Sequence, residues 1–491
     1  MSGGTPSLTK QGTAVFIGQF IGFVINFCTP IIVVRLISVS DYGVLQQFLL
    51  LGNTLIPILM FGLGASLYYF YPVNVDKMLD SYVLNTYLLT ALSGLLFVLA
   101  SLFFGDSILE WFGMQALIEH NLLIAFYILF LLVGGLMEIL TVLEKRLRLT
   151  MIFNPIDKVV RMTLLVSAAF LDQSVSSCLM ALLVYSGVRF VLVTGYIFSR
   201  YRNRVTLRDS LMNMKTQLIY STPFAIAIVC TTLSERFDKF VVNKYIDSAE
   251  FAVYSLAFYS IPVLGQAFNS INNVVIPKMS SLLEENRLDE VLELFKKVVL
   301  KTSSLALPAI TFFMIMAPEI IVFLFTDKYE NAVPYYRFFM LTILIVMTGF
   351  GNVLRAAKKT RQIMVASFIG MLVTVAFGSL IIPRMGMNGA IITSVIGVTL
   401  PGVLQLYLVA KCLNSSLAEF LPWKSIGLAF VASLIPTLLI IPFKIFDLPL
   451  FLTLSISAAL YFPMAVILEY WFKIFAFQEN VSKIFSRLTS R

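Results

Sequence analysis

Charged side chains inside long apolar segments are the residues of this chain that could do chemistry. A first group lies near the middle of the first half of the chain and counts three bases and two acids: Lys158, Arg161, Arg189, Glu138 and Asp157. Two acids can neutralise two of the bases, so one cation could remain for an anion such as phosphate. Lys158 has a second interpretation, because its long side chain could reach the polar interface of a membrane.

A second group of charges follows further along the chain. It contains Glu235, Arg236, Asp238 and Lys239, with Glu235 and Lys239 on one helix face. Equal numbers of acids and bases predict a local ion-pair cluster. Binding of an anion by the bases, or of a coupling proton or sodium ion by the acids, is the alternative. Arg35, upstream of both groups, fits a topological anchor as well as a contact to a ligand.

Side-chain amides recur at helical spacing in three apolar segments. Intervals of seven residues, or of three plus four, place the amides of one segment on one helix face. In lipid such groups must contact protein or water, which predicts a hydrophilic cavity. Hydrogen bonding between closely packed helices is the alternative, and Gly18 and Gly22 would permit that close approach. The amides are Gln19, Asn26, Gln46, Asn53, Gln266, Asn269 and Asn273.

The segments that carry these residues are long apolar helices. Hydrophobic residues make up 59% of the 491 residues and charged residues only 13%, a composition that no soluble domain could solvate. Stretches of this length cross roughly 30 Å of hydrocarbon as helices, whereas barrel strands would alternate apolar and polar residues. The prediction is an all-α, polytopic membrane protein with about fourteen spans: 12–34, 44–68, 83–104, 117–143, 151–171, 175–198, 218–242, 251–275, 299–325, 335–353, 363–382, 389–410, 425–443 and 448–472.

Lys and Arg are distributed unequally over the connections between the spans. If the N-terminus is cytoplasmic, the inner loops and tails hold 25 of the 36 basic residues, the outer loops six and the spans five. This asymmetry predicts that both termini are cytoplasmic. The net charge of +9 then reflects topology at the inner leaflet, and a nucleic-acid partner is not expected.

An internal repeat predicts two halves. VVRLISVSDYGV (residues 33–44) resembles VVNKYIDSAEFAV (residues 241–253), at a shift of about 209 residues. We therefore expect two six-helix lobes, related by an axis along the membrane normal, with a shared cavity and two extra C-terminal helices. The expected divisions are an N-terminal lobe (1–199), a basic cytoplasmic linker (200–216), a C-terminal lobe (217–412), and helices 13 and 14 with a cytoplasmic tail (413–491).

These segments resemble a known family. QGTAVFIGQFIGFVINFCTPIIVVRLISVSDYG, LSERFDKFVVNKYIDSAEFAVYSLAF and the span layout are similar to the polysaccharide transporters of the superfamily that includes the multidrug and toxin extruders, above all to Wzx-type O-antigen and capsule flippases. The resemblance implies alternating access in the bacterial cytoplasmic membrane and an undecaprenyl-pyrophosphate-linked glycan as substrate. Asp238 and Lys239 stand where the family has an acid followed by a base, more commonly Arg.

The resemblance also frames the partners and the alternatives. Besides the lipid-linked glycan and membrane lipids, a polysaccharide polymerase and a chain-length regulator are candidate partners. A lipid II flippase and a cation-coupled multidrug exporter of the same superfamily are alternatives, and the exporter would use an acid such as Glu138, Glu235 or Asp238. A membrane polymerase or ligase is less favoured, because the longest outer loop, about 105–116, is too short to fold alone.

The same residues predict no cofactor. The four cysteines and the single histidine lack the spacing of a metal site, and no phosphate-binding loop pattern occurs. We therefore expect a transporter rather than an enzyme. Its drive would be the membrane potential or a proton or sodium gradient.

Overall fold

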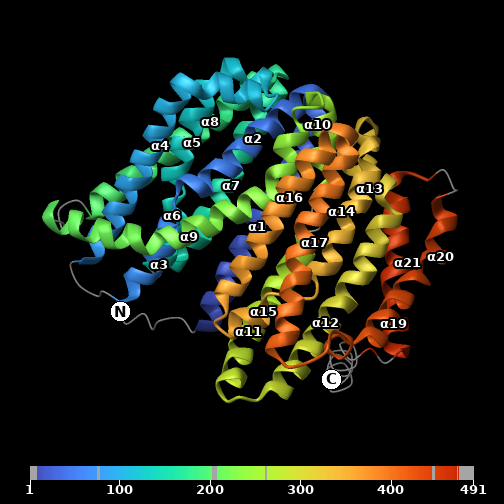
Figure 1. The fold of residues 1–491 in the computed structure, drawn as a ribbon. Helices are drawn as coiled ribbons and strands as arrows, with labels where there is room; N and C mark the ends of the chain where they lie inside the picture. The colour runs from blue at the N-terminus through green and yellow to red at the C-terminus, as the bar shows by residue number, and fades with distance from the viewer. Residues whose placement is uncertain are drawn as a thin grey trace, which may run out of the picture. The chain divides into compact units, whose positions relative to one another are not determined.

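The computed structural model describes residues 8–73, 78–144, 146–201, 207–259, 262–444, 448–472 and 474. Within these residues every regular element is a helix, which confirms the all-α prediction (Figure 1). The chain forms two compact units, a first unit of Met1–Ala252 and a second unit of Val253–Arg491.

The first unit is built from long helices that pack in pairs. The helix α1 packs along α7, α5 packs against α4 and α8, and α9 packs against α2, α3 and α4. The elements are α1 (Leu8–Leu36), α2 (Val39–Leu59), α3 (Leu63–Val73), α4 (Met78–Trp111), the 3-10 helix η1 (Gln115–His120), α5 (Asn121–Gly134), α6 (Leu136–Leu143), α7 (Leu147–Asp172), α8 (Val175–Tyr201) and α9 (Leu207–Val242), with α10 (Ser248–Ala257) crossing into the second unit.

The second unit is also built from helices that pack in pairs. The helix α17 packs extensively against α16 and α14, and α12 packs extensively against α19. The elements are α11 (Pro262–Glu284), α12 (Leu288–Ile315), α13 (Ala317–Phe325), η3 (Asp327–Ala332), α14 (Val333–Val346), α15 (Asn352–Ala356), α16 (Thr360–Met385), α17 (Met387–Cys412), α18 (Leu417–Phe420), α19 (Trp423–Leu434), α20 (Thr437–Ile440), η4 (Ile441–Lys444) and α21 (Leu450–Trp471).

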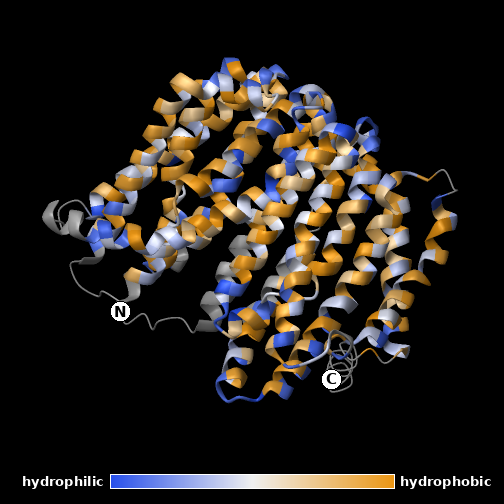
Figure 2. Cartoon of the chain, viewed as in Figure 1, coloured by the Kyte–Doolittle hydropathy of each residue, from blue (hydrophilic) through white to orange (hydrophobic). Residues whose placement is uncertain are grey.

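Ten helices among the described residues are long and apolar enough to cross a membrane, and apolar residues dominate their ribbons in Figure 2. Four expected spans are helical without meeting this standard. The first lies in α1, of which only the side chains from Phe20 to Leu36 are described as an apolar stretch. The fifth carries charges midway along α7, the eighth is divided between α10 and α11, and the tenth ends with α14. The protein is a multi-pass membrane protein.

The order of elements repeats from one unit to the other. The 3-10 helix η1 begins at Gln115, and η3 begins at Asp327, 212 residues later. Each is followed by two shorter helices and then by a long pair, α7 and α8 in the first unit and α16 and α17 in the second. The two long pairs have nearly equal lengths, so positions along α7 and α8 have direct equivalents along α16 and α17.

The repeated sequence motif also has the same local structure in both copies. The Ser38 Oγ accepts a hydrogen bond from the backbone N–H of Asp41, 3.0 Å away, at the start of α2. The Asp247 Oδ1 accepts one from Glu250, 2.7 Å away, at the start of α10. Both copies therefore start a helix with a side-chain N-cap, the arrangement that satisfies an otherwise unpaired backbone donor.

The helix α9 lies with the first unit, although the sequence suggested that it opens the second lobe. A seam of buried polar side chains holds it there. The Asn213 amide donates to Ser81 Oγ (2.6 Å), and the Gln217 amide donates to Ser66 Oγ (2.9 Å) and Thr86 Oγ1 (2.7 Å). The compact units thus divide at residue 252, and the lobe boundaries drawn from the sequence stay predictions.

Candidate functional site

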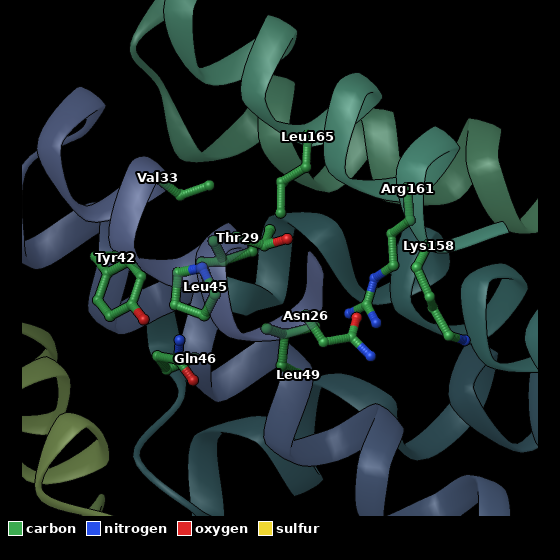
Figure 3. A pocket seen from close by; sticks show the side chains of 11 residues that line it. Asn26, Thr29, Val33, Tyr42, Leu45, Gln46, Leu49, Lys158, Arg161 and Leu165 are labelled. Atoms are coloured by element: carbon green, nitrogen blue, oxygen red, sulfur yellow. The ribbon is translucent and has the colours of Figure 1, made fainter. Parts of the chain in front are cut away.

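A pocket of about 170 Å³ opens between α1, α2 and α7 in the first unit. Its wall is apolar except for a few polar groups that come from three helices. Amide groups of Asn26 and Gln46 face it from α1 and α2, and Arg161 and Lys158 line it from α7 (Figure 3). The remaining lining residues are Thr29, Pro30, Val33, Tyr42, Leu45, Leu49 and Leu165.

Arg161 and Asn26 face each other in this pocket. Figure 3 shows the Arg161 guanidinium directed toward the Asn26 amide, while the Lys158 ammonium points away from it. Among the described residues, no acid forms an ion pair with Arg161. The pocket therefore combines one unneutralised guanidinium with neutral amides, a set of donors suited to an anionic group that also carries hydroxyls.

The other four charges of this region neutralise one another beside the pocket. Arg189 Nη1 lies 3.2 Å from Asp157 and its Nη2 lies 3.0 Å from Glu138, while Lys158 Nζ lies 3.0 Å from Asp157 and 3.4 Å from Glu138. Tyr185 completes the network by donating to Asp157 at 2.8 Å. The sequence predicted one remaining cation without naming it, and the geometry identifies it as Arg161.

Arg189 is committed to the protein on every side. Its Nε donates to the Gly134 carbonyl at 3.1 Å and its Nη1 lies 3.1 Å from the Tyr185 hydroxyl. The Arg189 and Asp157 side chains are only 7% and 5% exposed. A guanidinium enclosed by four partners orients its neighbours, so the geometry favours a positioning role over direct contact with a ligand.

The helices α7 and α8 cross at the ion pair of Asp157 and Arg189. The equivalent pair in the second unit, α16 and α17, allows a comparison. Asp157 is the eleventh residue of α7, and Gly370 is the eleventh of α16; Arg189 is the fifteenth of α8, and Pro401 is the fifteenth of α17. A Cβ at Gly370 would overlap Pro401 Cγ and lie 3.0 Å from its Cδ. In the second unit, Gly370 packs directly against Pro401 at the equivalent crossing, without any charged residue. The fold alone therefore does not require the ion pairs of the first unit.

The charges of α9 do not line the pocket. Asp238 is buried, Glu235 is exposed, and Arg236 and Lys239 are half-buried. Arg236 and Lys239 both interact electrostatically with Glu235 and Asp238. This arrangement agrees with a locally neutralised cluster, and its roles in substrate binding or ion coupling stay predictions.

Other expected site residues lie elsewhere. Arg35 is exposed in the last turn of α1 and donates to the Ile31 carbonyl, where a cation suits the helix C-terminus. Asn53, seven residues after Gln46 on α2, is exposed and does not line the pocket. The side chains of Gln19, Gln266, Asn269 and Asn273 lie outside the described part of the structure.

Two contributors to the site were not found from the sequence. Tyr185 lies four residues before Arg189 on the same helix face, a spacing that could have suggested their contact. At Gly134 an added Cβ would lie 2.9 Å from Arg189 Cγ, so only glycine leaves space for this side chain. No local signal predicts that requirement, because it arises from the packing of α5 against α8.

Comparison with known proteins places this geometry in context. A family model described as "Polysaccharide biosynthesis protein" matches residues 32–334, more than half of the chain. The "Capsular polysaccharide biosynthesis protein CapF" of Staphylococcus aureus is 19% identical over 225 residues, which are 45% of this chain. The match spans only 57% of the length of that relative.

Solved structures show the fold. A structure titled "Lipid II flippase MurJ, inward closed conformation" is similar over 97% of this chain and 99% of its own, with a TM-score of 0.73 at 15% identity. An inward-facing multidrug resistance MATE family transporter of the MOP superfamily is similar over 80% of this chain and 94% of its own, with a TM-score of 0.65 at 16% identity. The chain thus shares its fold with these two transporters, and by its family match it belongs to the polysaccharide biosynthesis protein family.

Proposed function

We propose that this protein is a flippase that moves undecaprenyl-pyrophosphate-linked oligosaccharide from the inner to the outer leaflet of the bacterial cytoplasmic membrane by alternating access. The observation that carries the proposal is the pocket in which Arg161, without an acid partner among the described residues, faces the Asn26 amide. The guanidinium would bind the pyrophosphate, and the amides would bind polar groups next to it.

The physical argument concerns the cost of bringing this substrate into a membrane. Each polar group that loses water without a new hydrogen bond costs several kcal/mol, so a pyrophosphate with several sugars needs a polar path. A guanidinium offers paired donors that match phosphate oxygens. The inside-negative potential then favours outward movement of an anion by about 2.3 kcal/mol per charge per 100 mV.

The relatives support this choice among the alternatives. CapF is described as a capsular polysaccharide biosynthesis protein and MurJ as a lipid II flippase, and both descriptions concern glycans or their lipid-linked precursors. A multidrug exporter shares the fold, but the wall of the Arg161 pocket contains no acid. A lipid II flippase remains the second candidate, because its substrate presents the same pyrophosphate.

The test is a flipping assay in vesicles with purified protein and a fluorescent undecaprenyl-pyrophosphate oligosaccharide. Arg161→Gln should lower the flipping rate strongly while the protein stays folded, and Arg161→Lys should retain an intermediate rate. Arg384→Gln, which removes an exposed cation from the end of α16, is the matched control and should keep the normal rate. Equal rates for wild type and Arg161→Gln would contradict the proposal, and faster movement of lipid II would favour the second candidate.

The proposal also covers the energy source of transport, the membrane topology and the neighbouring proteins. We propose that the membrane potential suffices for export and that no cofactor takes part, so vesicles with an imposed potential and no ion gradient should still export. A requirement for a proton or sodium gradient would instead point to an acid such as Glu138, whose carboxylate is the most exposed of its cluster. Both termini would be cytoplasmic, with a polysaccharide polymerase and a chain-length regulator as neighbours in the membrane.

A further inference from the structure

A second cationic cluster lies in the first unit where α6, α7 and α8 meet. Its centre is Glu144, whose side chain is only 2% exposed. Arg146 Nε lies 3.0 Å from Glu144 Oε2 and Arg200 Nε lies 3.3 Å from Oε1. Tyr196 donates to the same carboxylate at 2.6 Å, and Tyr201 donates to its other oxygen. We refer to these five residues as the Glu144 corner.

The two guanidinium groups of the Glu144 corner remain open to the surroundings. The Arg146 and Arg200 side chains are 43% and 40% exposed, although both are anchored to a buried carboxylate. The ion pairs place Nε of each group against Glu144, and the Arg200 side chain is also hydrogen-bonded to Tyr201. Two cations on one acid leave one positive charge in excess, and the tyrosines fix the carboxylate that holds them together.

The fold does not need this cluster, because the equivalent corner of the second unit lacks it. Arg146 immediately precedes α7 as Lys359 precedes α16, and Arg200 is the twenty-sixth residue of α8 as Cys412 is of α17. In the second unit Lys359 Nζ donates to Cys412 Sγ at 3.1 Å. Glu144 is the C-cap residue of α6, and the C-cap residue of the equivalent helix α15 is Ala357.

The Glu144 corner also lies at the beginning of the helix that carries Arg161. Arg161 lies fifteen positions after Arg146, which corresponds to roughly 22 Å along the helix axis. The distribution of Lys and Arg predicts that the Arg146 end is cytoplasmic. A lipid-borne anion in the inner leaflet would therefore meet the Glu144 corner before it reached the pocket.

We propose that Arg146 and Arg200, held by Glu144, form a first binding site for the pyrophosphate of the carrier lipid. The inference rests on the proposed function and adds a capture step ahead of the Arg161 pocket. Two convergent guanidinium groups suit a pyrophosphate, because each can give parallel hydrogen bonds to phosphate oxygens. Tyr196 and Tyr201 act through Glu144 and are positioning residues.

The test measures binding of undecaprenyl pyrophosphate by native mass spectrometry to the full-length protein in zwitterionic nanodiscs. All variants carry Arg161→Gln, so that the guanidinium of the pocket does not contribute to binding. Adding Arg146→Gln and Arg200→Gln should weaken binding roughly tenfold or more, the effect of losing one charge-assisted hydrogen bond. Lys359→Gln, the matched change in the second unit, should leave binding unchanged.

A second variant distinguishes loss of the binding site from misfolding. Glu144→Ala with Arg146→Lys and Arg200→Cys copies the corner of the second unit, which closes with these residue types. It should keep the melting temperature near that of the parent protein and lose binding as the glutamine variant does. Unchanged binding in both variants would overturn the proposal.

Competing ligands separate the sources of phosphate. Displacement by inorganic pyrophosphate, with little effect of phosphatidylglycerol, supports recognition of the carrier's pyrophosphate. Equal displacement by phosphatidylglycerol would overturn it in favour of a general phospholipid contact. Failure of the proposed function would look different, since the wild type would then bind the carrier at the Glu144 corner without flipping its glycan.

Discussion

Arg189 on α8 and Asp157 on α7 form a buried ion pair at 3.2 Å, at the crossing that glycine and proline form in the second unit. Because the same helix crossing exists with and without charge, the pair is not a general requirement of this fold. Arg189 and Lys158 each form ion pairs with both Asp157 and Glu138, so both acids near the pocket are already neutralised. The consequence is that Arg161 keeps its charge for another partner.

Breaking this pair should destabilise the protein. Asp157→Asn leaves Arg189 with one acid fewer in an enclosed site, and removal of one partner from a buried pair typically costs about 3–5 kcal/mol. The double variant Asp157→Asn with Arg189→Gln should recover part of that loss. Thermal unfolding in detergent measures both. A single variant as stable as the wild type would show that water screens the pair.

Cysteine accessibility should outline the Arg161 pocket. In a protein whose four native cysteines are replaced by alanine, cysteines at positions 26 and 46 should react with a membrane-impermeant thiol reagent, and substrate should slow the reaction. Thr54→Cys, on the same helix as Gln46 but buried, is the control and should react far more slowly. Equal reaction at all three positions would contradict a pocket that opens to water.

Close backbone contact at Gly43 should make this position intolerant of any side chain. A Cβ there would overlap the carbonyl oxygen of Ser248 at the start of α10, so Gly43→Ala must push α2 and α10 apart. Overpacking of this kind costs about 1–3 kcal/mol or more, and the melting temperature should fall. Gly195→Ala is the control, because no atom lies within 4 Å of a Cβ at that position. Equal melting temperatures for the two variants would refute the contact.

The seam between α9 and its neighbours should tolerate an apolar replacement at modest cost. Gln217→Leu removes the bonds to Ser66 and Thr86, but both hydroxyls already donate to carbonyls of their own helices. We expect a loss of about 1 kcal/mol, since no donor is left unpaired. Gln217→Ala should cost more because it also leaves a cavity. A larger loss for leucine than for alanine in thermal unfolding would show that the seam depends on its polar contacts.

Local sequence properties were sufficient for the class of the protein. The long apolar runs predict membrane helices because a helix satisfies its own backbone in lipid wherever it lies. The repeat of the SVSDYG and DSAEFA segments was visible because both copies need the same N-cap, made by Ser38 and Asp247. Counting three bases against two acids likewise predicted a cation in excess without any knowledge of distances.

Tertiary structure decided which cation that is and which helices α9 packs against. Lys158 and Arg161 are three residues apart on α7, and both were candidates for the remaining cation. Asp157 adjoins Lys158 in sequence, but only the packing of α6 brings Glu138 to Lys158 as well and leaves Arg161 facing Asn26. The Glu144 corner was invisible for the same reason, since its tyrosines come from the far end of α8. Charge and hydropathy are properties of single residues and short windows. Pairing depends on which helix faces meet, and packing alone determines that.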